Sequence, residues 1–229
     1  MKTHFRIGIM GGMGPEAGIL LQSLIINETP AEKDQDHLEV FTYTNPHVPD
    51  RTQSLKEDGG ESYLNAVTES LNLLESVGVD ILVIACNTAH ARISEIQESV
   101  KTPILNIVEL AKSEIIKTNG VVGILATDGT LKSCLFTISE NPKKTITPNE
   151  KLQIEVMNVI HDIKKGLKDG SVEKRLQKVI NSMMESGCKK FVLGCTELSI
   201  YNKELSNLFG DIFIDPMVLA AKKLVKMGK

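Results

Sequence analysis

The sequence contains no tryptophan, and aromatic residues make up only 4% of its 229 residues. So few rings leave little material for the base-stacking surfaces that bind single-stranded nucleic acids. The net charge of −3 provides no overall positive field that could attract nucleic acid or an anionic membrane. The composition therefore predicts neither nucleic-acid nor membrane partners.

Long apolar stretches are also missing. The longest runs, such as ILVIAC, have the length of a strand and are far too short to cross a bilayer. Glycine, proline and Glu16 interrupt the N-terminal segment, and no small-residue cleavage site follows, so we expect no signal peptide. Without an export signal, the four cysteines are expected to be reduced thiols in the cytoplasm. No CxxC pair occurs and no histidines cluster with the cysteines, so no metal site is expected.

Strand-like and helix-like segments alternate along the whole chain, which is typical of α/β proteins with mainly parallel sheets. Three elements recur in the same order, at spacings of 115, 109 and 109 residues, and this indicates an internal duplication. We expect two pseudo-symmetric α/β lobes with an active site in the cleft between them. One lobe is predicted to comprise residues 1–100 with a returning segment at 208–229, and the other residues 101–207. The matched pairs are Gly8 with Gly123, Cys86 with Cys195, and Asn106 with Asp215.

Two cysteines end apolar strands in matching contexts, LVIACNTAH and FVLGCTELS. Each is expected where a strand passes into a helix, so the helix N-terminus could lower the thiol pKa by roughly one unit. Ligands of α/β folds bind at the carboxyl ends of strands, so Cys86 and Cys195 would approach one ligand from opposite sides. A base and an acid on opposite faces of a carbon can invert a stereocentre without a cofactor. The neighbouring Asn87, Thr88 and Thr196 could hold the carboxylate beside that carbon.

The motifs IGIMGGMGP, PDRT, ACNTAH, ATDGT, IKKG and GCTEL, in this order and spacing, resemble the aspartate/glutamate racemase family, and specifically its aspartate racemase branch. The resemblance extends over essentially the whole chain. It implies two similar α/β lobes, racemisation of aspartate with glutamate as a further possible substrate, catalysis by two cysteines, no cofactor, and commonly a homodimer. The glutamate racemase branch has an acidic residue and a histidine near places that Met10 and Leu198-Ser199 occupy here, which favours the aspartate branch.

The resemblance also implies site residues. Cys86 and Cys195 would be the acid/base pair, and Met13 in the GGMG turn would line the pocket. Arg51 and Lys164 would be the cations that recognise the distal carboxylate. The residues that would bind the α-carboxylate and amino group are Asn87, Thr88, Thr127 and Thr196.

Alternatives exist for several of these residues. Arg51 lies in a long polar stretch, residues 45–60, which is expected to be a binding loop, although the arginine could be an ordinary surface charge. Lys164 has Lys165 and Lys168 close by, so a charged helix face is an alternative. Glu197 could cap the helix start. Cys134 and Cys188 are expected to be plain buried residues, and His90 to support the structure.

Other functions are also compatible with parts of the sequence. GMGPEA fits the G-x-G-x-x-G/A dinucleotide pattern, but Glu16 would occupy the helix end that a pyrophosphate needs. A racemase or isomerase of the same fold could act on another carboxylate. A non-catalytic amino-acid-binding relative would be expected to lack one thiol, and both are present.

Overall fold

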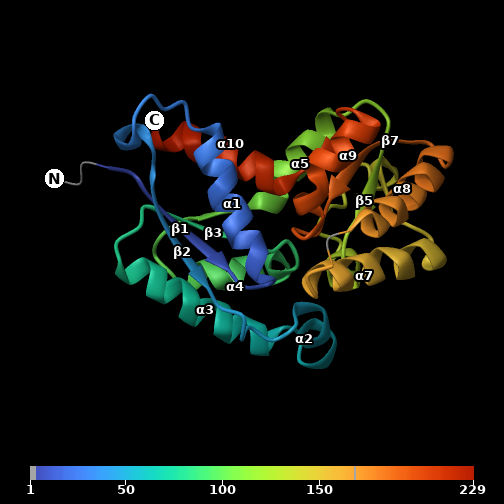
Figure 1. The fold of residues 1–229 in the computed structure, drawn as a ribbon. Helices are drawn as coiled ribbons and strands as arrows, with labels where there is room; N and C mark the ends of the chain where they lie inside the picture. Colours follow the sequence, from blue (N-terminus) through green and yellow to red (C-terminus); the bar gives the residue numbers. More distant parts are fainter. Residues whose placement is uncertain (1–3, 168) are drawn as a thin grey trace. The chain divides into compact units, whose positions relative to one another are not determined.

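The computed structural model describes residues 4–167 and 169–229, which form two compact units (Figure 1). The first unit extends to Ile107 and resumes at Met217, and the second runs from Val108 to Pro216. Each unit is built on one four-stranded sheet whose strands are all parallel. The predicted fold class, two similar α/β lobes with parallel sheets, is confirmed. Among the described residues, no helix is long and apolar enough to cross a membrane.

The two sheets have the same strand order. In the first the order is β2 (Glu39–Thr44), β1 (Arg6–Gly11), β3 (Ile81–Ile84) and β4 (Ile104–Leu105). In the second it is β6 (Thr145–Ile146), β5 (Val121–Leu125), β7 (Cys188–Leu193) and β8 (Phe213–Ile214).

The strand register confirms the duplication seen in the sequence. In the first sheet, Gly8 lies opposite Leu82, which in turn lies opposite Ile104. In the second sheet, the corresponding run of partners is Gly123, Phe191 and Phe213. Each residue of the second run lies 115, 109 and 109 positions, respectively, after its counterpart in the first run. These are the spacings that the sequence predicts.

Helices connect the strands, as parallel pairing requires. The α-helices are α1 (Pro15–Glu28), α2 (Arg51–Glu57), α3 (Glu61–Ser76), α4 (Ile93–Glu98), α5 (Ile107–Lys117), α6 (Asp128–Lys132), α7 (Glu150–Lys164), α8 (Gly170–Glu185), α9 (Asn202–Phe209) and α10 (Pro216–Gly228). Short 3₁₀ helices are η1 (Asp34–Asp36), η2 (Thr88–Arg92), η3 (Pro142–Lys144) and η4 (Leu198–Tyr201).

The core of each unit lies between its sheet and the covering helices. In the first unit, α1 and α3 lie on opposite sides of the sheet (Figure 1). Met10, Leu82 and Ile84 share one face of the sheet and pack with buried residues of α3 such as Val67 and Leu71. In the second unit, strands β5 and β7 pack with α7 and α8 in the same way.

The expected lobe boundaries need a correction. The strand Ile104–Leu105 was expected in the second lobe, but it pairs with β3 in the first sheet. The strand Phe213–Ile214 was expected to return to the first lobe, but it pairs with β7 in the second. The chain therefore changes unit after each of these edge strands, so that the returning part is α10. The pattern of apolar residues predicts these short strands. It does not predict the sheet with whose edge strand each of them forms hydrogen bonds.

The stretch of residues 45–60 is also more regular than expected. Instead of a loop, it contains the helix α2, which Arg51 opens. The Asp50 carboxylate caps this helix by accepting a hydrogen bond from the Gln53 amide at 2.9 Å. The helix has only seven residues, which are too few to show the apolar spacing of a helix in the sequence. The prolines and polar residues of this stretch therefore predicted a loop.

Gly12 fixes the turn between β1 and α1. Its backbone has φ +107°, and a Cβ atom there would lie 2.1 Å from the carbonyl oxygen of Asn45, the residue that follows β2. Only glycine fits this close approach. The turn places the next residue, Met13, at the carboxyl edge of the first sheet.

We expect Gly12→Ala to lower the free energy of unfolding by about 3 kcal/mol or more, because a left-handed backbone and overpacking each cost about 1–3 kcal/mol. Gly187→Ala is the matched control, since Gly187 has φ +98° and a Cβ atom added there would meet nothing within 4 Å. The control should lose only the backbone contribution, about 1–2 kcal/mol. Urea unfolding of both variants measures the difference, and equal losses would show that the Asn45 contact is unimportant.

Candidate active site

Cys86 lies just beyond the carboxyl end of β3. The amide of the preceding residue, Ala85, still donates to the Met10 carbonyl of β1 at 2.9 Å, so the sheet holds the chain up to the cysteine. Cys86 is a free, buried thiol that belongs to the same buried cluster as Met13, Val48 and Tyr63. The short helix η2 begins two residues later.

Asn87 has a buried amide that the rest of the described chain leaves unpaired. The residue is only 2% exposed, yet its side-chain oxygen and nitrogen both lack a hydrogen-bond partner among the described residues. It precedes η2 without capping it. Buried polar groups without partners are rare and costly, so an unpaired amide beside a thiol is suited to holding a polar ligand. Thr88, the next residue, is also buried.

Arg51 is a buried cation. It is 7% exposed, and its guanidinium donates to three main-chain carbonyls, those of Val48, Pro49 and Met13, at 3.3, 3.0 and 3.3 Å. No carboxylate pairs with it within residues 4–167 and 169–229, and its Nε has no partner there. A buried charge without a counter-ion is unfavourable, so this guanidinium is suited to receiving an anion. The surface-charge alternative for Arg51 does not fit its burial.

The second cysteine has a different environment. Cys195 follows β7 at the equivalent position and is also buried and free. Its thiol donates to the Glu197 carboxylate, with 2.8 Å between Sγ and Oε2. The hydroxyl of Thr196 also donates to this carboxylate, at 3.5 Å. The Glu197 side chain is itself buried, and Lys164 Nζ lies 4.0 Å from its other oxygen.

Burial is the largest cause that raises the pKa of Cys195 well above its usual value, and the negative charge of Glu197 raises it further. Lys164 acts in the opposite direction and lowers this pKa. The expectation of a helix-lowered thiol pKa is therefore wrong for Cys195. The helix that begins nearest to this cysteine is the four-residue 3₁₀ helix η4, so few aligned amides oppose the burial and the neighbouring carboxylate.

The other residues expected at the site lie near one of two centres, which are Cys86 and Cys195 with their surroundings. Some are near in the sequence and others in the structure. The Met13 carbonyl binds Arg51, and the side chain is buried in the cluster that contains Cys86. Thr127 follows β5 and caps α6 by accepting from the Thr130 amide. Lys164 ends α7 and lies near Glu197, whereas Lys168 is outside the described residues.

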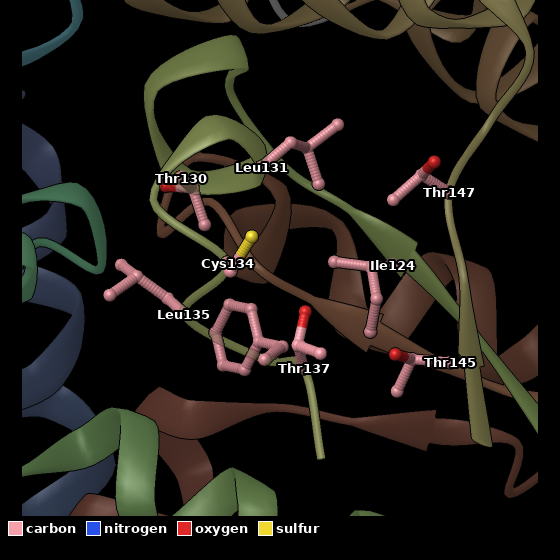
Figure 2. Close-up of a pocket in the computed structure, with 9 residues that line it drawn as sticks. Ile124, Thr130, Leu131, Cys134, Leu135, Thr137, Thr145 and Thr147 are labelled. Atoms are coloured by element: carbon pink, nitrogen blue, oxygen red, sulfur yellow. The ribbon is translucent and has the colours of Figure 1, made fainter. Parts of the chain in front are cut away.

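Cys134 and Cys188 take different places. Cys188 is buried, as expected, and burial raises its pKa to about 11. Cys134 was expected to be buried but is exposed; it lies just beyond the end of α6, where the backbone has φ +52°. It borders a hollow of about 30 Å³ in the second unit, lined by apolar and threonine side chains (Figure 2). That volume holds about one water molecule, so the hollow is too small for an amino acid.

Two buried residues at these centres were not selected from the sequence. The sequence allows Glu197 to cap the helix that follows, but its side chain makes no capping bond to η4 and instead accepts from Cys195. Tyr63 of α3 is fully buried, and its hydroxyl has no partner among the described residues. The position of Glu197 two residues after a candidate thiol was the available signal. Nothing in the sequence around Tyr63 distinguishes it from an ordinary core residue.

The described residues contain no group of three or more His, Cys, Asp or Glu side chains that could hold a metal ion.

The duplicated parallel sheets and the two strand-end thiols define a class of two-lobed α/β proteins with paired cysteines. The sequence pattern of the family described as Asp/Glu/Hydantoin racemase matches residues 10–224, nearly the whole chain. The protein belongs to this family.

The chain is similar to several proteins named as amino-acid racemases. It is 32% identical over 171 residues to a glutamate racemase of Deinococcus radiodurans, covering 73% of this chain. It is 30% identical over 136 residues to the broad specificity amino-acid racemase RacX of Bacillus subtilis, covering 57% of this chain. These matches span 57% and 58% of the two relatives.

Among solved structures, the fold matches that of an aspartate racemase of Picrophilus torridus. The TM-score is 0.85 at 30% identity, and the match covers 98% of this chain and 94% of the other. The two-lobed fold of the family therefore extends over this whole chain.

The His90 side chain binds the main chain of Cys86. Its Nδ1 donates to the Cys86 carbonyl at 2.8 Å, and burial lowers the pKa of the ring to about 4. The imidazole is therefore neutral near pH 7. This contact supports the turn after Cys86, in agreement with a structural role.

We expect stability to fall on acidification through His90. An unfolded histidine binds a proton below about pH 6.5, whereas the folded ring does so only below about 4. Acidification through this window thus favours the unfolded state, by about 3 kcal/mol in total. In His90→Gln this contribution should vanish, so the free energy of unfolding should depend less on pH between these limits. Carboxylates such as Asp58 titrate in both proteins and cancel in the comparison. Parallel pH profiles would contradict the neutral, buried ring.

Proposed function

We propose that this protein is a cofactor-independent racemase that interconverts L- and D-aspartate and uses glutamate less well. One observation carries the proposal: two free, buried thiols occupy equivalent strand ends in two duplicated units. Family membership supports a racemase. The similarity to an aspartate racemase over 98% of the chain supports aspartate as the substrate.

In the proposed reaction, the thiolate of one cysteine removes the α-proton of the amino acid. The thiol of the other cysteine delivers a proton to the opposite face of the same carbon. The α-carbon is inverted, and the enzyme is left with its proton on the other sulfur. Cys86 and Cys195 exchange roles for the other enantiomer. Because both groups are side chains of this protein, no cofactor or metal takes part in the scheme.

The proposed substrate contacts follow from the charges at each centre. Arg51 is proposed to bind the distal carboxylate, since it is buried without a counter-ion among the described residues. Lys164 is proposed as a second cation for that carboxylate, although its proximity to Glu197 leaves it less available than Arg51. Met13 is proposed to line the pocket. The α-carboxylate and amino group are assigned to Asn87, Thr88, Thr127 and Thr196. We further propose a homodimer, which the family resemblance supports, and a cytoplasmic location, which the four free cysteines support.

We expect Cys86→Ser and Cys195→Ser each to abolish racemisation of aspartate, because a hydroxyl is far too weak a base at neutral pH. Each variant should nevertheless exchange the α-proton of one enantiomer with solvent, through its remaining thiol. The two variants should therefore show opposite enantiomer preferences. Chiral chromatography measures racemisation, and nuclear magnetic resonance in deuterated water measures the exchange.

The control is Cys134→Ser, which removes an exposed thiol and should leave the rate unchanged. All assays use protein dialysed against a chelator and hydroxylamine. A need for added pyridoxal phosphate, or near-normal racemisation by either variant, would rule out the two-cysteine mechanism. Loss of the same enantiomer's exchange in both variants would also rule it out.

We expect Arg51→Ala to reduce kcat/KM for aspartate roughly ten- to a hundred-fold, since a charge-assisted contact to a carboxylate contributes about 1.5–3 kcal/mol. Alanine, which lacks the distal carboxylate, should be affected much less. Arg175→Ala is the control, because that arginine pairs with Glu155 and Asp162 in the second unit. Equal losses for aspartate and alanine would favour the alternative of a racemase for other carboxylates.

A further inference from the structure

The two thiols differ in the charge that their surroundings present. Cys195 donates its proton to a carboxylate, that of Glu197, at 2.8 Å. Deprotonation would break this hydrogen bond and place two negative charges side by side in a buried site. The one cation near this pair in the described chain, Lys164, lies 4.0 Å from the far oxygen of Glu197 and has a side chain 27% exposed to solvent. The surroundings therefore favour the protonated form of Cys195.

No carboxylate accepts a hydrogen bond from Cys86 in the described part of the chain. Its buried cluster includes Met13 and Val48, whose carbonyls hold the Arg51 guanidinium. A thiolate here would supply the negative charge that this buried cation lacks within the described residues.

Tyr63 adds a polar group to the same cluster. Its hydroxyl is buried and has no partner among the described residues, so its O–H dipole is free to turn toward a negative charge. Cys86 is the titratable group that affects Tyr63 most, and like burial it raises the tyrosine pKa. The hydroxyl therefore lies within the electric field of this sulfur.

The other charged groups near this cluster are balanced. Arg92 of η2 pairs with Glu95 at 2.6 Å and with Glu61 at 3.6 Å. His90 is buried and neutral, since burial lowers its pKa to about 4. Among the charged residues near the Cys86 cluster, Arg51 is therefore the cation that has no acidic partner in the described chain.

We propose that the two thiols lose their protons in a fixed order: Cys86 first, in the cluster that contains Tyr63 and whose carbonyls hold Arg51, and then Cys195, which donates to Glu197. This inference rests on the proposed function in assigning both thiols to one reaction. In this order, the active form of the enzyme before substrate binds carries a thiolate at Cys86 and a thiol at Cys195. It is ready for the enantiomer whose α-proton Cys86 removes.

The order has a consequence for turnover. In the ready form, the α-proton passes to the Cys86 sulfur, and the Cys195 proton passes to the opposite face of the carbon. The free enzyme is then left with a thiol at Cys86 and a thiolate at Cys195, the less stable arrangement. Exchange with water, one proton released from Cys86 and one taken up by Cys195, restores the ready form. The Glu197 carboxylate makes this recovery favourable.

The order can be measured without substrate, from the ultraviolet absorbance of the thiolate as a function of pH. Cys195→Ser leaves Cys86 to titrate, and Cys86→Ser leaves Cys195. Cys134 and Cys188 are present in both proteins, and a Cys86→Ser/Cys195→Ser double variant supplies their background. We expect the Cys86 transition at least one pH unit below the Cys195 transition. Coincident transitions, or the reverse order, would overturn the inference.

Two further substitutions test the causes. In the Cys86→Ser protein, Glu197→Gln should move the Cys195 transition down by one pH unit or more, since a like charge nearby disfavours the charged form of a thiol. In the Cys195→Ser protein, Tyr63→Phe should move the Cys86 transition to higher pH. Tyr43→Phe, which removes a hydroxyl from β2 of the same unit, should not. A transition unmoved by Glu197→Gln or by Tyr63→Phe would contradict the cause assigned to that residue.

These measurements separate the inference from the proposed function. Folding of each variant is checked by circular dichroism, and the comparison of the two single cysteine variants does not depend on Glu197 or Tyr63 substitutions. A protein without racemase activity could still show the ordered transitions. A fully active racemase with coincident transitions would retain the function and lose the inference.

Discussion

Parallel pairing of β1 with both of its neighbours is the constraint on which the candidate site depends. Parallel strands run in one direction, so their carboxyl ends lie along one edge of the sheet. In the first sheet, this edge carries the turn at Gly12 and Met13, then Asn45 and Cys86. In the second sheet, the same edge carries Cys195. Each of the two thiols is thus held at the end of a buried strand, where its backbone has little freedom.

Duplication gave the two centres the same scaffold but not the same chemistry. The residues after the first cysteine are Asn87 and Thr88, and the equivalent positions after the second are Thr196 and Glu197. The first centre contains a buried arginine with no acidic partner among the described residues, and the second contains a buried glutamate. Two units with the same strand order therefore hold their thiols in opposite electrostatic surroundings. The difference between them comes from the residues that diverged after the duplication.

The sequence predicts the fold well because the features that determine it are local. Apolar strands of the length of VDILVIAC, separated by amphipathic helices, specify parallel sheets, and the matched spacings specify two of them. The sheet to which a two-residue strand belongs depends on tertiary pairing, so Ile104–Leu105 and Phe213–Ile214 were assigned to the wrong units. The side-chain contacts of Glu197, the burial of Arg51 and the exposure of Cys134 also depend on packing that no local pattern reports.

The exchange of unit after β4 and again after β8 bears on how the protein is made. Most of the first unit precedes the second in the sequence, yet the first unit also includes α10, whose buried face includes Met217, Ala221 and Leu224. A Cβ on Gly228 would meet Leu38 and Phe5, which shows how closely the end of this helix packs on the beginning of the chain. As the chain leaves the ribosome, the second unit can complete its core before the first, although it is translated later. The first unit stays incomplete until α10, which is translated after the second unit, has emerged.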